Sequence, residues 1–452
     1  MAPIEEIKRD NVKEFFTWAF LNKASWGPED EEELNFYVEE TEKVLGRKIE
    51  EGRGKAVALR LTLDDVVMLQ RSLTWYFCVF VVDTITYVYM LGHSFHFHRI
   101  PLPRFLTVFP FRPLTLFSVK ESPSKSISYW HRPHTSKKRL PILFIHGIGI
   151  GLYPYVNFLA ELNHAANETG DVIDGDDGEV GIIAIEYMPI SFRITSAALT
   201  RDEMCDDILA IINAHQWSKF VLITHSFGSV IATHMFHFPP LSPKIGPALL
   251  IDPVSFLLHL PDVAYNFIAR KPKQANEFQL YYFASMDMGV AHTLGRHFFW
   301  SENILWKEEV KGRKITAVLS GKDLIVNTEA VGRYLTEGGA TENDDFEASS
   351  GSGRPSARMN GALHGILKKN GVIHRRPNRK ENGKPNGTTT AIPNGKGSTN
   401  IRDDNWKFRP WKGKGLDILW FEDLDHAQVF DSKRNRRKLV DIVRAYCLSD
   451  AT

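Results

Sequence analysis

The sequence contains only three cysteines in 452 residues, Cys78, Cys205 and Cys447, and they lie far apart in the chain. Three widely spaced cysteines provide neither a disulfide framework nor the closely spaced thiolates of a zinc site. We therefore expect a protein of a reducing, intracellular compartment. The first ten residues carry charges of both signs and lack the apolar core of a secretory signal, which agrees with that expectation.

An excess of charge of either sign is also missing. The 55 Lys and Arg residues are matched by 54 Asp and Glu residues, so the formal net charge is +1. This balance gives no support for a nucleic-acid partner, which usually requires a basic surface. The apolar content of 43% and the charged content of 24% are ordinary for a soluble globular protein. The length suits one large domain with appendages.

One long apolar run, residues 73–91, is the exception to this soluble pattern. It is about long enough to cross a bilayer. However, Asp83 lies at its centre, where a charge costs about 2.5–3.5 kcal/mol in a membrane span. The aromatic residues Trp75, Tyr76, Tyr87 and Tyr89 would suit a membrane interface. We therefore favour a helix that covers the core or lies on a membrane over one that spans it.

Three histidines follow this run, His93, His96 and His98. They suggest a metal site, but no acidic or cysteine ligand accompanies them. We therefore expect no metal and no cofactor.

A short apolar run at residues 220–223 is the most informative segment of the chain. It leads into Thr224-His225-Ser226-Phe227-Gly228, and a helical pattern with small residues follows. This order is typical of a nucleophile elbow, in which a sharp strand-to-helix turn exposes a serine hydroxyl. The pattern departs from G-x-S-x-G because Thr224 stands at the first glycine. Ser226 is nevertheless the candidate nucleophile for acyl transfer.

A glycine-rich turn follows a second apolar run, in the segment His146-Gly147-Ile148-Gly149-Ile150-Gly151. Such a turn allows backbone N–H groups to point at the substrate oxygen that becomes negatively charged during acyl transfer. We assign the two oxyanion donors to the N–H groups of Ile148 and Phe227. The alternative is a dinucleotide loop, but the spacing is G-x-G-x-G and not G-x-G-x-x-G.

A serine nucleophile needs a base to remove its proton. A predicted strand at 314–319 is followed by Asp323, and the last predicted strand, 416–421, is followed by His426. In folds with such a serine elbow, the serine, the acid and the histidine follow one another along the chain in this order. Asp252, after the predicted strand 248–251, is the alternative acid, and we favour Asp323.

Each of these partners also has a purely structural interpretation. Asp323 could cap the turn that follows its strand, and His426 could be an ordinary loop histidine. His225 and His234 flank the elbow, and we expect them to pack locally rather than to react.

Together, His146-Gly147, Ser226, Asp323 after Ser320-Gly321, and His426 resemble the α/β-hydrolase superfamily over roughly residues 110–445. The resemblance implies an α/β fold with a mostly parallel sheet and helices on both faces. It also implies a triad in which Ser226 attacks, His426 moves the proton and Asp323 holds the imidazole.

The implied activity is cleavage of carboxylic esters or related acyl bonds, as in esterases and lipases. A thioesterase or a tailoring hydrolase of secondary metabolism is the alternative within enzymes. A non-catalytic, membrane-associated binding protein is the alternative from another class, because fold does not determine function. The expected partners are a small hydrophobic ester or acyl substrate and a membrane surface, in the cytoplasm or associated with a membrane.

The domain organisation follows from changes in composition. We expect an N-terminal helical extension over 1–110, and the hydrolase core over 111–336 and 406–447. An aromatic segment at about 255–307 is expected to form a lid, which favours a hydrophobic substrate. Residues 337–405 are rich in Gly, Pro, Ser and Asn, and are expected to be a disordered insertion.

Overall fold

The computed structural model describes residues 3–167, 177–336 and 404–448. The chain divides into two compact units, Met1–Ala58 with Gly339–Asp404, and Leu59–Gly338 with Asn405–Thr452. The insertion predicted at 337–405 lies outside the described residues, except for Asp404 and Asn405.

The first unit contains two helices, α1 (Arg9–Ala19) and α2 (Glu31–Leu45). They pack through aromatic rings, with the ring centroids of Phe16 and Tyr37 5.6 Å apart. Both helices lie in the segment predicted as a helical extension, and α2 begins shortly after Pro28. It ends at Gly46, whose φ of 66° lies in the left-handed region that glycine tolerates best.

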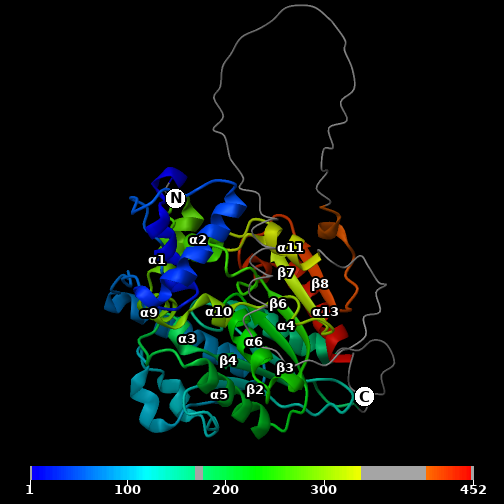
Figure 1. The fold of residues 1–452 in the computed structure, drawn as a ribbon. Helices are drawn as coiled ribbons and strands as arrows, with labels where there is room; N and C mark the ends of the chain where they lie inside the picture. Colours follow the sequence, from blue (N-terminus) through cyan, green and yellow to red (C-terminus); the bar gives the residue numbers. More distant parts are fainter. Residues whose placement is uncertain (1–2, 168–176, 337–403, 449–452) are drawn as a thin grey trace, which may run out of the picture. The chain divides into compact units, whose positions relative to one another are not determined.

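The second unit is built on one eight-stranded sheet with the strand order β1-β2-β4-β3-β5-β6-β7-β8 (Figure 1). The strands are β1 (His96–His98), β2 (Ser128–Arg132), β3 (Ile142–Ile145), β4 (Ile182–Glu186), β5 (Phe220–His225), β6 (Ile245–Ile251), β7 (Ile315–Ser320) and β8 (Leu416–Phe421). β2 runs antiparallel to both β1 and β4, and the remaining neighbours are parallel. The prediction of a mostly parallel sheet is confirmed.

The sequence does not predict β1, because three residues in the pattern His-Phe-His carry no recognisable strand signal. β1 lies within the N-terminal extension predicted over 1–110, and the compact unit that contains the sheet begins at Leu59.

Alternate residues of the central strands enter two separate hydrophobic cores, one on each face of the sheet. Leu222 of β5 belongs to the core that contains residues of α5 (Arg201–Ala214) and α6 (Gly228–His237). Val221 and Ile223 belong to the core that contains residues of α4 (Val156–Asn167) and α13 (Lys433–Leu448). This alternation is expected for a sheet that is covered on both faces. The helices of this unit outside the 255–307 segment are α3 (Leu73–Gly92), α4 (Val156–Asn167), α5 (Arg201–Ala214), α6 (Gly228–His237), α11 (Thr328–Thr336) and α13 (Lys433–Leu448).

The segment predicted as a lid, 255–307, is largely helical. It contains α7 (Asp262–Ala264), α8 (Ala275–Gln279), α9 (Met288–His297) and α10 (Trp300–Asn303), with π-helical turns at Tyr265–Ala269 and Leu280–Ser285. We refer to residues 255–307 as the cap.

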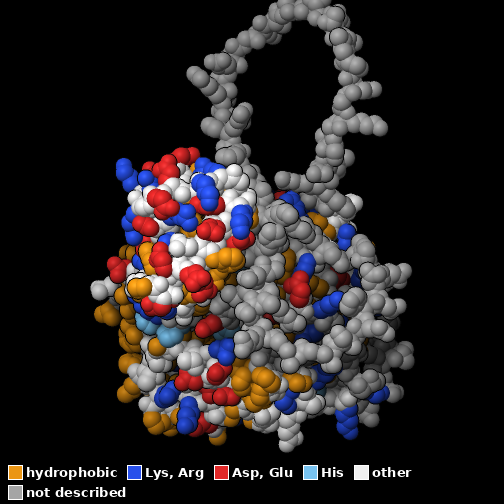
Figure 2. Space-filling view, viewed as in Figure 1, with side chains coloured by type: hydrophobic (Ala, Val, Ile, Leu, Met, Phe, Trp, Pro, Cys, Tyr) orange, Lys and Arg blue, Asp and Glu red, His pale blue; other side chains and the backbone are white. Residues whose placement is uncertain are grey.

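The helix α3 is unusual because its exposed face is apolar. Its buried residues include Asp83, whereas Phe77 is 63% exposed and Val88 is 56% exposed. Among the described residues, α3 alone is long and apolar enough to cross a membrane, and 28% of its most apolar stretch is buried. The view in Figure 2 shows hydrophobic side chains gathered along its left edge, around α9 and the loops that follow α3.

Candidate active site

Ser226 lies at a sharp turn between β5 and α6, as the sequence predicts for an elbow. Its φ of 51° lies in the left-handed region, which non-glycine residues rarely adopt. The N–H of Ser226 donates to the carbonyl of Ile251 on the neighbouring strand at 2.9 Å, which holds the turn in place. A Cβ atom at Gly228 would lie 2.6 Å from the carbonyl oxygen of Ile145, so this position requires glycine.

The structure brings Ser226, His426 and Asp323 together. The Oγ atom of Ser226 lies 2.8 Å from Nε2 of His426, and Nδ1 of His426 lies 2.7 Å from Oδ2 of Asp323. The other oxygen of Asp323 accepts hydrogen bonds from the N–H groups of Ile325 and Val326 at 2.7 and 2.9 Å. These bonds orient the carboxylate toward the histidine. Asp323 therefore both caps the turn and contacts the imidazole.

Asp252, the alternative acid, lies close to the same histidine but contacts other groups. It is fully buried, and its carboxylate accepts the hydroxyl of Ser320 at 2.7 Å and the N–H of Ala427 at 2.9 Å. Its φ of 43° is also left-handed. Asp252 thus supports the backbone next to His426, while Asp323 bonds to the ring.

The glycine-rich turn lies directly against the elbow. A Cβ atom at Gly147 would lie 2.8 Å from the Cβ atom of Ser226, so the close approach depends on this glycine. In the described part of the chain, the N–H groups of Ile148 and Phe227 have no hydrogen-bond partner. Both residues line the same cavity as Ser226, where unpaired donors can meet a substrate oxygen.

Two further residues connect these parts, and the sequence analysis did not assign them a role at the site. The hydroxyl of Tyr155 lies 2.8 Å from Nδ1 of His225 and accepts the N–H of Gly147 at 3.3 Å. Nε2 of His225 lies 3.7 Å from the carboxylate of Asp252. His225 therefore packs locally, and it links the glycine-rich turn to the acidic side of the site. Only the spatial proximity of these residues reveals the link.

The order of the strands and the position of each group now identify the architecture. The serine turn follows β5, the acid follows β7, the histidine follows β8, and the antiparallel β2 lies near one edge of an otherwise parallel sheet. The chain has the fold of the α/β-hydrolase superfamily.

No protein-family model matches this sequence, and no curated protein matches it either. Solved structures that resemble the chain include a bacterial membrane phospholipase A described as a virulence factor (9% identity, TM-score 0.42, 83% of this chain and 94% of that one). A carboxylesterase of the thaumarchaeon Nitrososphaera gargenis has 12% identity and a TM-score of 0.38, over 73% of this chain and 98% of that one. Carboxylesterase CesB of Bacillus subtilis has 9% identity and a TM-score of 0.39, over 80% and 98%. The fold assignment therefore rests on the strand order and not on these similarities.

The electrostatic surroundings of His426 favour its charged form. Burial by itself would lower the pKa of the imidazole, but the charge and hydrogen bond of Asp323, together with the charge of Asp252, raise the pKa to about 9. Burial also opposes ionisation of Asp252, yet the facing His225 and His426 hold the pKa of that carboxyl below its ordinary value. The candidate site thus contains an imidazole close to two carboxylates.

The cavity next to Ser226 has a volume of about 40 Å³. Its lining, apart from the serine, is apolar and comes mainly from the cap: Leu61, Ile148, Phe227, Val254, Val263, Ala264, Phe267, Ile268, Leu294, Phe298 and Ile325. A cavity of this size holds only a few water molecules. It cannot accommodate a long acyl chain unless the cap moves.

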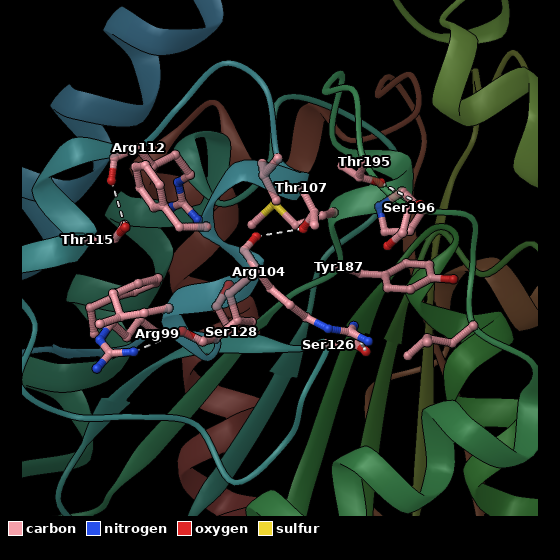
Figure 3. Close-up of a pocket in the computed structure, with 18 of the residues that line it drawn as sticks. Arg99, Arg104, Thr107, Arg112, Thr115, Ser126, Ser128, Tyr187, Thr195 and Ser196 are labelled. Atoms are coloured by element: carbon pink, nitrogen blue, oxygen red, sulfur yellow. Dashed lines mark hydrogen bonds between the residues drawn. The ribbon is translucent and has the colours of Figure 1, made fainter.

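A second and larger cavity, of about 60 Å³, lies beneath the segment that follows β1 (Figure 3). Its lining is mixed: apolar side chains such as Phe105 lie beside arginine, serine and threonine side chains, including Arg104, which donates to the hydroxyl of Ser126 at 2.8 Å. None of Ser226, Asp323 or His426 lines this cavity. Because Ser226 lines the smaller cavity and its Oγ lies 2.8 Å from Nε2 of His426, we place the candidate active site there.

Proposed function

We propose that this protein is a serine hydrolase that cleaves carboxylic esters or related acyl bonds of a hydrophobic substrate. The single observation that supports the proposal most strongly is the continuous hydrogen-bonded chain from Ser226 through His426 to Asp323. The two unpaired backbone donors of Ile148 and Phe227 in the same cavity supply the oxyanion site that such a reaction requires.

The proposed reaction has two halves. In the first, Nε2 of His426 takes the proton of Ser226 as the serine Oγ bonds to the acyl carbon, and the carbonyl oxygen becomes an anion that the two backbone N–H groups bind. The intermediate collapses, the bond to the leaving group breaks, and His426 donates its proton to the departing oxygen. In the second half, water attacks the acyl-enzyme with His426 as base, which releases the acid and restores the serine.

The apolar cavity supports a hydrophobic acyl group. Its walls from the cap include Phe267, Leu294 and Phe298, which offer no hydrogen-bond partner to a polar acyl chain. An ester whose acyl part is alkyl or aryl would therefore bind better than a charged one.

The test is intact-mass spectrometry after treatment with a fluorophosphonate probe, followed by hydrolysis of p-nitrophenyl esters of increasing chain length. We expect one adduct per chain on the wild type and none on Ser226→Ala or His426→Ala, both checked for folding by circular dichroism. Thioesterase activity is tested with an acyl-thioester of the preferred chain length. If the folded wild-type protein neither reacts with the probe nor turns over any ester, the non-catalytic binding protein is the better interpretation.

We further propose that the exposed apolar surface around α3 rests on a lipid bilayer. Of the 28 exposed large hydrophobic side chains among the described residues, seventeen lie between residues 63 and 119. In α3 they follow a helical stripe formed by Leu73, Phe77, Val81, Ile85 and Val88. Contiguous exposed apolar surface of this extent is typical of a lipid or protein contact.

The charges of this surface favour an anionic membrane as the partner. Near this stripe Arg104 is exposed and Arg71 is half-buried, whereas the side chain of Arg112 is largely buried beneath α3 with Asp83 and Glu186. Cationic side chains among exposed apolar ones match the negative surface of such a bilayer. Because one face of α3 packs against the protein, the helix would lie along the membrane rather than cross it.

Flotation of the full-length protein with vesicles tests this proposal. We expect binding to vesicles that contain phosphatidylserine and its loss in the double variant Phe77→Glu, Ile85→Glu. The matched control is Phe36→Glu, which changes a 45% exposed aromatic residue of the first unit. Failure of the wild type to float, or an equal loss in the control, would contradict the proposal. Self-association through this surface, detected by light scattering, would identify a second copy as the partner instead.

A further inference from the structure

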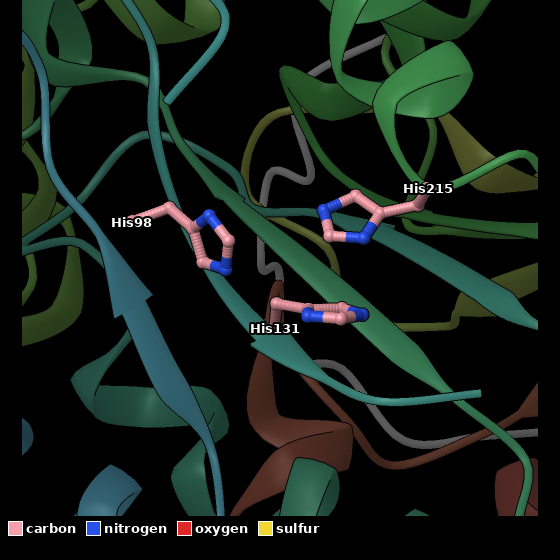
Figure 4. Close-up of side chains that lie close together, drawn as sticks. All are labelled: His98, His131 and His215. Carbon is pink, nitrogen blue, oxygen red and sulfur yellow. The ribbon is translucent and has the colours of Figure 1, made fainter. Parts of the chain in front are cut away.

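Three histidines from distant parts of the sequence converge at the edge of the sheet. His98 lies in β1, His131 lies in β2, and His215 follows the last residue of α5 (Figure 4). Each offers one ring nitrogen such that the three atoms lie within 4.8 Å of one another. In the sequence His98 stands close only to His93 and His96, and no local pattern places β1 beside β2.

Two of these rings are buried with a nitrogen that has no partner. His98 is 9% exposed and His131 is 8% exposed. In the part of the chain that the structure describes, Nε2 of His98 and Nδ1 of His131 form no hydrogen bond. Buried polar atoms nearly always have a partner, so two unsatisfied nitrogens at one place require an explanation.

The tyrosine between the rings completes the arrangement. The hydroxyl of Tyr129 lies 2.9 Å from Nδ1 of His98 and 2.9 Å from Nε2 of His215. A histidine that binds a metal through one nitrogen usually donates its other N–H to an oxygen, which fixes the ring. Tyr129 can do this for His98, because it contacts Nδ1 and leaves Nε2 available.

We propose that His98, His131 and His215 bind one Zn²⁺ ion. Imidazole is a preferred ligand of zinc, and three histidines with one further ligand make a tetrahedral site. Zinc–nitrogen bonds are about 2.0–2.1 Å long, so the three rings must move inward to bind one ion. Of the three, only His215, at the end of α5, is not fully buried. When the rings move inward, Nε2 of His215 loses its hydrogen bond to the hydroxyl of Tyr129. That hydroxyl keeps its hydrogen bond to His98.

The fourth ligand is water or His96. His96 lies opposite His131 in the register of β1 and β2, on the same face of the sheet as His98. In either case the ion fastens β1, a three-residue edge strand, to β2 and to the end of α5. The role of such an ion is structural, because the cluster does not contact the Ser226 cavity.

The experiment uses the full-length protein, stripped with a chelator and titrated with Zn²⁺ by isothermal calorimetry, with bound metal measured by mass spectrometry. We expect one Zn²⁺ per chain and an increase in Tm when zinc is present. Loading with Co²⁺ is expected to give the visible absorption of a tetrahedral site.

The variants separate this site from zinc bound elsewhere. His215→Ala changes the least buried ligand and is expected to abolish the titration and the Tm increase. Tyr129→Phe removes only the hydroxyl and is expected to weaken zinc binding about 10- to 100-fold. His292→Ala, on the exposed side of α9, is the matched control and should bind as the wild type. Absence of zinc binding by the wild type, or unchanged binding by folded His215→Ala, would overturn the proposal.

Discussion

Asp83 and Arg193 form a buried ion pair in which Nε of Arg193 donates to Oδ2 of Asp83 at 3.1 Å. Arg112 lies 3.6 Å from the same carboxylate, and it also pairs with Glu186 at 2.8 Å. Two carboxylates and two guanidinium groups therefore balance one another beneath α3. Asp83, the charged residue that makes a membrane span of α3 unfavourable, faces the protein, and the apolar side of α3 faces outward.

Removal of this carboxylate is expected to destabilise the fold. Asp83→Ala leaves the buried Arg193 without its main partner, and such uncompensated charges cost about 3–5 kcal/mol. Urea unfolding followed by fluorescence measures the change in the free energy of unfolding. The control is Asp423→Ala, which breaks the exposed pair with Lys322 and should cost at most about 1 kcal/mol. Equal effects of the two substitutions would show that the buried pair is unimportant.

The raised pKa of His426 predicts how labelling of Ser226 depends on pH. With a pKa of about 9 against an ordinary 6.5, the imidazole is mostly protonated at pH 7 and can accept the serine proton only as the pH rises. The rate of fluorophosphonate labelling should therefore increase from pH 7 to a midpoint near pH 9. Asp323→Asn should move the midpoint downward. A wild-type midpoint near 6.5 would contradict the prediction.

The same shift predicts a pH dependence of stability. Since the pKa of His426 is higher in the folded protein than in the unfolded chain, its protonation stabilises the fold fully below about pH 6.5. This contribution is lost as the pH rises through about 9. Urea unfolding at several pH values should show the decline in the wild type and a smaller decline in His426→Gln, whose side chain does not titrate.

The glycine-rich turn offers a test with a matched control two residues away. A Cβ atom at Gly147 would lie 2.8 Å from both Nδ1 of His225 and the Cβ atom of Ser226, whereas a Cβ atom at Gly149 would meet no atom within 4 Å. Gly147→Ala should therefore abolish most labelling of Ser226 or lower Tm. Gly149→Ala should leave both nearly unchanged. Similar behaviour of the two variants would mean that the close approach at Gly147 has no functional consequence.

The two acids near His426 should differ in their effects. Asp323→Asn keeps the shape of the site but removes the charge that holds the imidazole, and in serine triads this change lowers kcat by about 10⁴-fold. Asp252→Asn removes a charge that bonds to Ser320 and Ala427, so we expect a lower Tm with a much smaller loss of kcat. Steady-state kinetics on the best ester, together with thermal melts, would distinguish them. The reverse order of effects would identify Asp252 as the acid.

Local sequence patterns predicted the parts of the fold that depend on neighbouring residues. The strands predicted at 220–223, 248–251, 314–319 and 416–421 each overlap an observed strand, because runs of β-branched and aromatic residues bounded by turns can be recognised without tertiary information. The elbow at Ser226, the turn at Gly147 and the order of Asp323 and His426 were recognisable for the same reason. The antiparallel direction of β2 was not, because strand direction depends on the connection and not on the residues of the strand.

The sequence by itself determined the fold class and placed Ser226, two candidate acids and His426 after strand ends in a fixed order. Only the tertiary structure decided which acid bonds to His426, since Asp323 and Asp252 both follow strands and differ only in position. Likewise, only the tertiary structure shows that Asp83 pairs with Arg193 and that His98 lies beside His131 and His215. These contacts join residues up to 117 positions apart, from His98 to His215, and no local pattern records a contact that forms only when the sheet and its helices assemble.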